Sequence, residues 1–373
     1  MKTAAISTPE SIYLLNHSVG LAPENTAIAL AKQFFSPWST ADESIWSNWL
    51  GGIEKFKAEL AQLLNGKPCD FCPQTNLSSG LTKILYSLPF SATKKTILLS
   101  EQDFPSMAFV CQMTKRFGFD TRFIPKDEDL NDETTWAHFL DDTIGVVLIT
   151  HVLSNTSQVL PVQKITSLCQ QHKVYSIVDI AQSVGILPID IDDFNADFIL
   201  GSSVKWLCGG PGAAFLWVNP KLIDQCQPVD VGWFSHENPF EFDPHRFQYA
   251  TDASRFWGGT PSIAPFIIAA NSIEYINTIG IEAIRRHNLR LTQPIIDRLS
   301  DHNLMSPRPE DQRGGTVVID MKENQPYFIE ALNVKNIKFD QRETGIRLSP
   351  HIYNSESEVA ILLSCIDRLC RSR

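Results

Sequence analysis

VDIAQSVGILPIDIDDFNADFILGSSVKWLCGGPG, which spans residues 178–212, is the stretch on which the predicted fold depends. Two short apolar runs, Tyr175–Val178 and Phe198–Leu200, lead into polar residues there. Apolar runs of this length, bounded by turn residues, are typical of buried strands in a parallel sheet. Ligands of such sheets bind beyond the carboxyl ends of the strands, where Asp179 and Lys205 follow the two runs. The sequence therefore predicts a carboxylate and a lysine in one crevice.

A carboxylate and a lysine at neighbouring strand ends suit one cofactor in particular. Pyridoxal 5'-phosphate (PLP) needs a lysine for its Schiff base and an acidic partner for its ring nitrogen. The alternative is a structural ion pair between Asp179 and Lys205 in an ordinary α/β enzyme. Spacing alone does not decide between these two interpretations.

The motifs of this stretch resemble those of a known family. V-D-x-A-Q-S-V-G, A-D-F and S-x-x-K-W-L, followed by G-G-P-G, are similar to motifs of the class V aminotransferases, which are fold-type I PLP enzymes, and most of all to those of kynureninases. The resemblance implies an α/β fold: a large domain over residues 16–262 with a mainly parallel seven-stranded sheet, and a smaller C-terminal α+β domain over residues 263–373 together with residues 1–15. It also implies that Lys205 is the Schiff-base lysine and Asp179 the partner of the pyridinium nitrogen.

Composition narrows the possible partners and the location of the protein. The 373 residues carry a net charge of −10 and no run of five basic residues, which argues against nucleic acid and anionic membranes as partners. No apolar stretch approaches the roughly 18 residues of a membrane span, and no signal peptide is visible, so we expect a cytoplasmic protein. Cys69 and Cys72 lack a second pair at zinc spacing, and we expect no metal site. Arg285, Arg286 and Arg290 fall at helical spacing and predict a solvated helix face.

A helix start at Thr75–Gly80 is a candidate phosphate site. Its hydroxyl groups and glycine, TNLSSG, precede an apolar helical pattern, and free N–H groups at a helix start attract anions. The alternative is an ordinary N-cap, which uses the same residue types. The position matches the phosphate-binding helix of the class V enzymes, so the resemblance assigns Ser78 and Ser79 to the cofactor phosphate.

Further cofactor contacts follow from the resemblance alone. Phe104, in the motif F-P-S, would stack on the pyridine ring, and Asn155, in H-V-x-x-N, would bind the phenolic oxygen or the substrate carboxylate. Gln182 would contact the phenolic oxygen, and Ser202 would bind the phosphate. Among the strands expected between these motifs are Thr96–Ser100, Ile144–Thr150 and Ala213–Val218.

Two later motifs imply a second subunit. Trp233, in G-W-F-S-H, would lie over the phosphate side of the cofactor, and Thr260 stands in the G-G-T-P turn. In dimers of the family this threonine reaches the phosphate of the opposite subunit. The resemblance therefore implies a homodimer with active sites at the interface.

The ends of the chain supply the candidate substrate residues. Arg347, in G-I-R-L-S-P followed by Y-N, matches the arginine that grips the α-carboxylate of the substrate, a task suited to a planar guanidinium. His17 matches an opening segment that borders the active site, and its alternative role is that of a loop histidine with satisfied hydrogen bonds. Residues 339–347 contain no cysteine, which argues against the sulfur transfer of cysteine desulfurases.

The resemblance predicts a small-molecule amino-acid substrate and, as activity, kynureninase-like hydrolysis of the Cβ–Cγ bond of β-acyl alanines. Met107, Gln182, Val204 and Thr260 depart from the usual kynureninase residues; Val204 stands where a tyrosine is usual. A class V aminotransferase, or a related PLP lyase or racemase acting on another amino acid, is therefore the alternative. A PLP-binding protein without catalysis is the third possibility.

Overall fold

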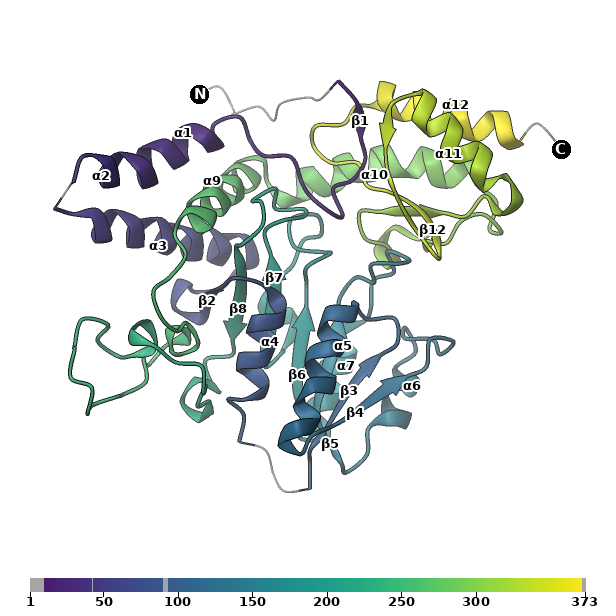
Figure 1. Cartoon of the computed structure of the whole chain (residues 1–373). Helices are drawn as coiled ribbons and strands as arrows, with labels where there is room; N and C mark the ends of the chain where they lie inside the picture. Colours follow the sequence, from purple (N-terminus) through teal and green to yellow (C-terminus); the bar gives the residue numbers. More distant parts are fainter. Residues whose placement is uncertain (1–9, 42, 90–92, 371–373) are drawn as a thin grey trace.

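A seven-stranded sheet forms the centre of the protein in the computed structural model, which describes residues 10–41, 43–89 and 93–370 (Figure 1). The strand order is β2-β8-β7-β6-β5-β3-β4, and β8 alone runs opposite to its neighbours. The strands are β2 (Phe71–Gln74), β3 (Thr96–Ser100), β4 (Asp120–Ile124), β5 (Ile144–Thr150), β6 (Tyr175–Asp179), β7 (Phe198–Ser202) and β8 (Ala214–Val218). The predicted mainly parallel sheet is confirmed.

Helices cover both faces of this sheet, as its buried apolar strands require. Val147 and Ile149 of β5 pack into the core beneath α3, α6, α7 and α9. Val146 and Leu148 point to the other face, towards α4 and α5, which lie on the near side of the sheet in Figure 1. The bounds are α3 (Ile45–Leu64), α4 (Leu77–Leu85), α5 (Pro105–Met113), α6 (Glu133–Phe139), α7 (Val162–Gln171) and α9 (Ala264–Ile279).

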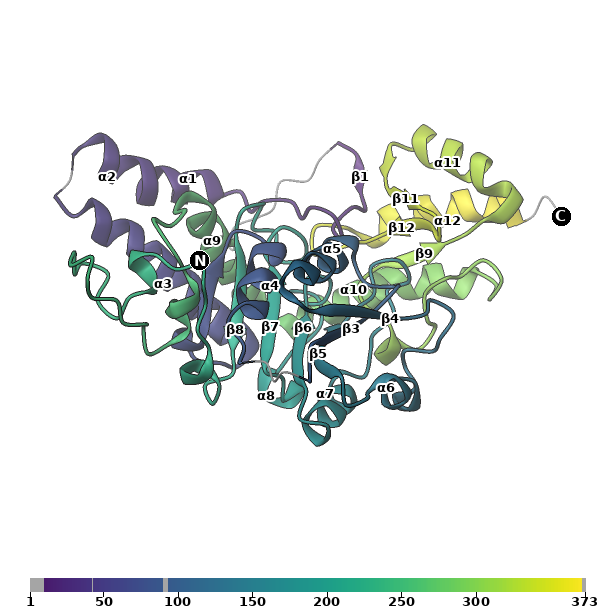
Figure 2. The same ribbon diagram turned by 60° about the horizontal axis from the view of Figure 1, so that its bottom comes forward.

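The C-terminal part is the smaller α+β unit that the sequence predicts. An antiparallel sheet of order β11-β12-β9 packs with three helices around its own apolar core. A two-stranded parallel sheet joins β1 to β10, and Figures 1 and 2 both place β1 beside this unit. The elements are β1 (Ile12–Tyr13), β9 (Val317–Ile319), β10 (Ile337–Lys338), β11 (Asp340–Arg342), β12 (Gly345–Leu348), α10 (Ile281–Arg298), α11 (Gln325–Val334) and α12 (Glu356–Cys370).

Helix α9 bears on the predicted domain division. Phe266, Ile267 and Ile273 of this helix are buried in the core that α3 and the large sheet share. The packing therefore favours a boundary near Gly280, after α9, over the predicted boundary at residue 263. The division itself stays a prediction.

One prediction about the helix faces is wrong. Arg285 of α10 is buried, and its guanidinium donates to the carbonyl oxygens of Glu310, Arg313 and Gly314. Arg286 and Arg290 are exposed, as predicted. Helical spacing could not reveal this difference, because the carbonyl groups that hold Arg285 lie about 25 residues further along the chain. No helix among the described residues, 10–41, 43–89 and 93–370, is long and apolar enough to cross a membrane.

Candidate active site

The carboxyl ends of the parallel strands line a cavity of about 200 Å³. Asp179 closes β6, and Thr150 closes β5 directly opposite it in the strand register. Lys205 follows β7 by three residues. Six of the predicted site residues line this cavity: Ser78, Phe104, Asp179, Gln182, Ser202 and Lys205.

Asp179 presents a buried carboxylate with one uncommitted oxygen. Its Oδ1 accepts the N–H of Ala181 at 2.8 Å, and no described residue donates to its Oδ2. Burial raises the pKa of Asp179, while the Ala181 N–H and the charge of Lys205 act in the opposite direction. A carboxylate in this position is stabilised by a cation, and the protonated ring nitrogen of PLP is such a cation. Asp179 therefore fits the group that the sequence predicts.

Lys205 lies in the turn between β7 and β8, close to an aromatic ring. Its Nζ is 5.7 Å from the centroid of Phe104, the N-cap residue of α5. Burial lowers the pKa of Lys205, the charge of Asp179 raises it, and that of Arg347 lowers it further. A lowered pKa makes the neutral amine more accessible, which is the form that can act as a nucleophile or a base. This position is compatible with the predicted stacking of Phe104 on the cofactor ring, which stays a prediction.

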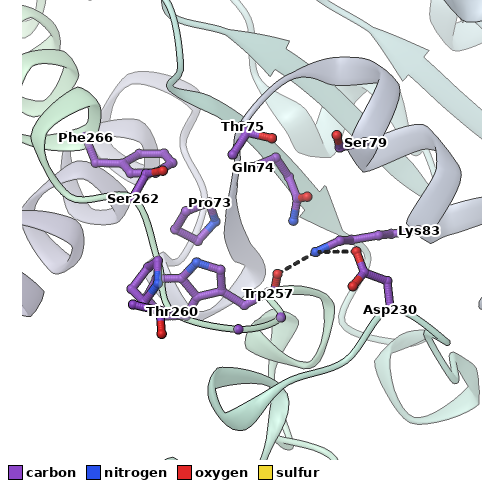
Figure 3. Close-up of a pocket in the computed structure, with 13 residues that line it drawn as sticks. Pro73, Gln74, Thr75, Ser79, Lys83, Asp230, Trp257, Thr260, Ser262 and Phe266 are labelled. Atoms are coloured by element: carbon purple, nitrogen blue, oxygen red, sulfur yellow. Dashed lines mark hydrogen bonds and ion pairs between the residues drawn. The ribbon is translucent and has the colours of Figure 1, made fainter.

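The start of α4 borders this cavity and a second one. Asn76 caps the helix by accepting the N–H of Ser79 at 2.9 Å, so capping is the task of the asparagine. The first N–H groups of a helix have no partner within it, and those at Leu77 and Ser78 are therefore suited to a phosphate. Ser78 lines the Lys205 cavity, whereas Ser79 lines the second cavity, of about 230 Å³, together with Thr260 (Figure 3).

The amide of Gln182 has a fixed orientation. Its Oε1 accepts from Trp206 Nε1 at 3.2 Å, and its Nε2 donates to the carbonyl oxygen of His17, also at 3.2 Å. An amide nitrogen carries two protons, so one N–H of Gln182 remains for a ligand. A donor at this position is compatible with the predicted contact to a phenolic oxygen.

Asp103 and Thr150 add a buried pair that the sequence interpretation missed. Asp103 Oδ1 accepts from Thr150 Oγ at 2.5 Å, and Oδ2 accepts the N–H of Ser100 at 2.7 Å. Burial raises the pKa of Asp103 to about 7, and the charge of nearby Asp179 raises it as well. The available signal was an acidic residue directly before the F-P-S motif, three residues after a buried strand.

Arg347 on β12 is held from two sides and keeps two donors. Its Nε and one terminal nitrogen, NH2, both donate to Asp340 Oδ2, and its other terminal nitrogen, NH1, donates to Ser154 O at 2.9 Å. A guanidinium has five N–H groups, so one remains on each terminal nitrogen. Two such donors can receive a carboxylate with two parallel hydrogen bonds. Ser154 itself lines the Lys205 cavity.

His17 lies beside this arginine but does not line the cavity. Its Nδ1 is 2.5 Å from Ser349 Oγ, and its Nε2 is 3.5 Å from Asp340 Oδ2. Burial lowers the pKa of His17 to about 4, so the ring is neutral at pH 7. Nδ1 thus has a partner, as the alternative of a loop histidine requires, but the buried Nε2 has no hydrogen-bond partner among the described residues. A substrate role for His17 stays a prediction.

The segment that carries His17 joins the smaller C-terminal α+β unit to the turn that carries Lys205. Leu14 N donates to Lys338 O at 3.1 Å, on the side of the small domain. Gly20 N donates to Val204 O at 2.9 Å, on the side of the lysine. A Cβ atom on Gly20 would lie 2.2 Å from the carbonyl oxygen of Lys205, so this close approach requires glycine.

Besides Ser79, three predicted cofactor residues do not line the Lys205 cavity. Asn155 is exposed, and its carbonyl oxygen accepts from Thr344 Oγ at 2.9 Å. Trp233 packs against Trp46, with ring centroids 5.6 Å apart. Thr260 is exposed at the second cavity. The roles of Asn155, Trp233 and Thr260 stay predictions.

Comparisons with known proteins find relatives over most of the chain. The family model described as Aminotransferase class-V matches residues 47–362. The uncharacterized aminotransferase YcbU of Bacillus subtilis is 28% identical over 319 residues, which cover 84% of this chain and 83% of the relative. The kynureninase of Shouchella clausii is 29% identical over 373 residues (94% and 86%), and that of Pseudomonas fluorescens is 27% identical over 354 residues (90% and 83%).

Solved structures share the fold over nearly the whole chain. The apo cysteine desulfurase of Thermococcus onnurineus superposes with a TM-score of 0.84 at 21% identity, covering 98% of this chain and 96% of its own. A mutant of C-DES with glycine covalently linked to its PLP cofactor gives a TM-score of 0.85 at 21% identity, with coverages of 96% and 97%. At this level of identity the likeness concerns the fold.

Proposed function

Because the chain belongs to the class V aminotransferase family of PLP-dependent enzymes, we propose that it hydrolyses the Cβ–Cγ bond of kynurenine-type β-acyl alanines. The observation that carries this proposal is the pair of free N–H groups on Arg347, whose charge acts on Lys205. This arrangement suits a substrate that has an α-carboxylate and reacts at the neighbouring carbon atoms. The relatives named kynureninase, at 27–29% identity, favour this reaction among those of the family.

The residues of the chain have distinct tasks in this reaction. PLP, when bound, withdraws electrons from the α-carbon of the amino acid attached to it. Lys205 would hold the cofactor in the resting enzyme and then accept the proton from the substrate Cα, a task helped by its lowered pKa. Asp179 would keep the ring nitrogen protonated, and Phe104 would cover the ring. Water supplies the atoms that complete the aromatic acid and alanine.

Cysteine chemistry fits this site poorly, although the structural neighbours include a cysteine desulfurase. Cys208 is three residues from Lys205, but it is buried against Gly20. Burial raises the pKa of the Cys208 thiol to about 12, so the thiolate that a sulfur-transfer enzyme needs is disfavoured. Residues 339–347, just ahead of and including Arg347, contain no cysteine.

A transaminase is the second candidate, and Val204 is the observation in its favour. Valine has no hydroxyl group, so it cannot take the phosphate contact or the proton transfer assigned to the tyrosine that kynureninases usually have there. YcbU, described as an aminotransferase, is 28% identical to this chain. A related lyase or racemase would use the same Lys205 and Asp179. A PLP-binding protein without catalysis would need neither the two unused N–H groups of Arg347 nor the contacts with Asp340 and Ser154 that orient its guanidinium.

The deciding experiment is an assay of the PLP-loaded protein with L-kynurenine and 3-hydroxykynurenine. Release of anthranilate or 3-hydroxyanthranilate together with one equivalent of alanine supports the proposal. Conversion that consumes a 2-oxo acid and yields no anthranilate would replace it with transamination. A PLP-loaded protein whose absorbance spectrum ignores a panel of amino acids would point to binding without catalysis.

We also propose that the protein acts as a homodimer. Thr260 and Trp233 lie outside the Lys205 cavity of their own chain, and Thr260 is exposed. If either residue contacts PLP, we expect it to do so in the site of a second copy. Sedimentation equilibrium of the PLP-loaded protein tests the proposal. A monomer at micromolar concentration would contradict it.

A further inference from the structure

Lys83 is a buried lysine that the reaction described above does not use. It lies in the last turn of α4, the helix whose first turn borders the Lys205 cavity, and it is 7% exposed. Its Nζ donates to Phe256 O at 2.9 Å and to Trp257 O, and it is 3.4 Å from Asp230 Oδ2. Figure 3 shows the amine directed between Asp230 and the backbone at Trp257.

These contacts give the amine two hydrogen bonds and one ion pair. A lysine ammonium has three N–H donors, and three oxygen atoms surround this one. A buried ammonium is costly unless it is paired in this way. The two carbonyl groups are consecutive in the chain, so Lys83 fixes the backbone direction at residues 256–257.

The backbone held by Lys83 leads directly to Thr260. Gly258 continues it with a φ of +117°, and its N–H and C=O bond to Ser235 Oγ at 2.9 Å and to Phe234 N at 3.0 Å. A Cβ atom on Gly258 would lie 3.4 Å from Lys83 Nζ. Within the described chain, no hydrogen bond reaches the backbone of residues 259–262. Thr260 therefore depends for its position on the fixed residues before it.

We propose that Lys83 is a positioning residue: it holds the 256–258 backbone so that Thr260 reaches the phosphate of bound PLP. The inference rests on the proposed role of Thr260. It makes α4 responsible for two phosphate contacts, one through the N–H groups of its first turn and one through the loop that its last turn holds. It applies whether Thr260 serves its own subunit or the partner.

A double-mutant cycle on PLP affinity tests this inference without any activity assay. The variants are Lys83→Met, which keeps an apolar stem and removes the ammonium, Thr260→Ala and the double variant. PLP dissociation constants come from equilibrium dialysis of each reconstituted protein. We expect each single variant to bind PLP about tenfold more weakly, the loss typical of one hydrogen bond to a charged group. The double variant should be no weaker than either, because both changes remove the same contact.

Lys57→Met is the matched control, because Lys57 is also a buried lysine of the large domain but pairs with Glu54. It should bind PLP like the wild type. Unchanged affinity in Lys83→Met, or a double variant about 100-fold weaker than the wild type, would overturn the inference. Unchanged affinity in Thr260→Ala would instead remove the role of Thr260, and the inference with it.

A second substitution keeps the test decisive should Lys83→Met not fold. Gly258→Ala places a methyl group at a positive φ beside Lys83 Nζ and so disturbs the same backbone from the other side. Its loss of PLP affinity should equal that of Thr260→Ala and should not add to it. A loss that multiplies with that of Thr260→Ala would again contradict the proposal.

Discussion

Asp340 binds Arg347 through a single carboxylate oxygen, which accepts hydrogen bonds from both Nε and a terminal nitrogen of the guanidinium. The two residues face each other across the hairpin of β11 and β12, in direct register. Asp340 Oδ2 also lies 3.1 Å from Arg342 Nε and 3.5 Å from His17 Nε2. The nearby His17 ring and the two arginine cations hold the pKa of Asp340 well below its usual range. The arginine is thus oriented before any substrate arrives, and it keeps two unused N–H groups.

Asp340→Asn should therefore weaken substrate binding more than turnover. An amide oxygen is a weaker acceptor than a carboxylate, so Arg347 loses orientation while its own N–H groups stay. We expect KM to rise about tenfold with kcat changed less than threefold. Steady-state kinetics with the best amino-acid substrate checks this. Asp301→Asn, the same change at an exposed aspartate that pairs with Arg308, should leave both constants unaltered.

Asp179→Asn should act mainly on turnover. Asparagine keeps the shape but cannot stabilise a protonated ring nitrogen, so the electron withdrawal that the reaction needs is weakened. We expect kcat to fall about 10²–10³-fold, the range seen when a charge-stabilising group is removed from an active site. Borohydride should still attach PLP to Lys205 in this variant. A kcat within threefold of the wild type would remove Asp179 from its assigned role.

Lys205→Ala should retain PLP only non-covalently. Borohydride reduction followed by denaturation should leave the cofactor on the wild-type chain and none on the variant, as judged by mass spectrometry of the intact protein. Cofactor fixed to another lysine in the variant would show that the assignment of Lys205 is wrong. Lys57→Met, at a lysine remote from the cavity lining, should be labelled like the wild type.

Asp103 should make stability depend on pH. Its pKa is about 7 in the folded protein, above the usual value of an aspartate, so the folded state holds a proton that the unfolded state has lost between about pH 4 and pH 7. Its contribution is fully present below about pH 4 and is lost as the pH rises through 7. Asp103→Asn does not titrate and should show a smaller decline.

Urea midpoints of the wild type and Asp103→Asn at several values between about pH 5 and pH 8 test the effect. The difference in unfolding free energy between the two proteins should change by roughly 2–4 kcal/mol over this range. Parallel curves for the two proteins would show that Asp103 ionises normally. Asp301→Asn, at an exposed site, provides the baseline.

Hybrid dimers can show which site Thr260 serves. In a hybrid of Lys205→Ala and Thr260→Ala subunits, only the second subunit can attach PLP to residue 205. If Thr260 acts across the interface, that site receives an intact threonine from its partner, and its PLP affinity should match the wild type. The Thr260→Ala homodimer should bind about tenfold more weakly. Equal weakness in hybrid and homodimer would place Thr260 in its own subunit's site.

Lys205 and Asp179 could be predicted because each directly follows a short apolar run, and parallel strands bring such ends together. β2 and β4 could not be predicted in this way. β2 contains Pro73, which counts against a strand. β4 has the sequence DTRFI at the sheet edge, where Asp120 is exposed and Thr121 and Arg122 are half-buried. Both strands form because neighbouring strands supply their hydrogen-bond partners.

The supporting contacts of the site lay beyond sequence interpretation for a different reason. Lys83 meets Phe256 across 173 positions, and Arg347 meets Ser154 across 193. No spacing or residue type in the sequence distinguishes Lys83 from an exposed lysine. Likewise, nothing distinguishes the carbonyl group of Ser154 from that of any other loop residue. Asp340 is only seven residues from Arg347, but its role depends on the register of a hairpin that a short polar strand does not reveal.

The segment from Leu14 to Gly20 connects the smaller C-terminal unit with the turn that carries Lys205. It is bonded to the small domain at Lys338 and to the lysine turn at Val204, with no room for a side chain at Gly20. Any rocking of the small domain would therefore pull on the backbone beside Lys205. The absorbance spectrum of bound PLP would then change when the smaller C-terminal unit moves.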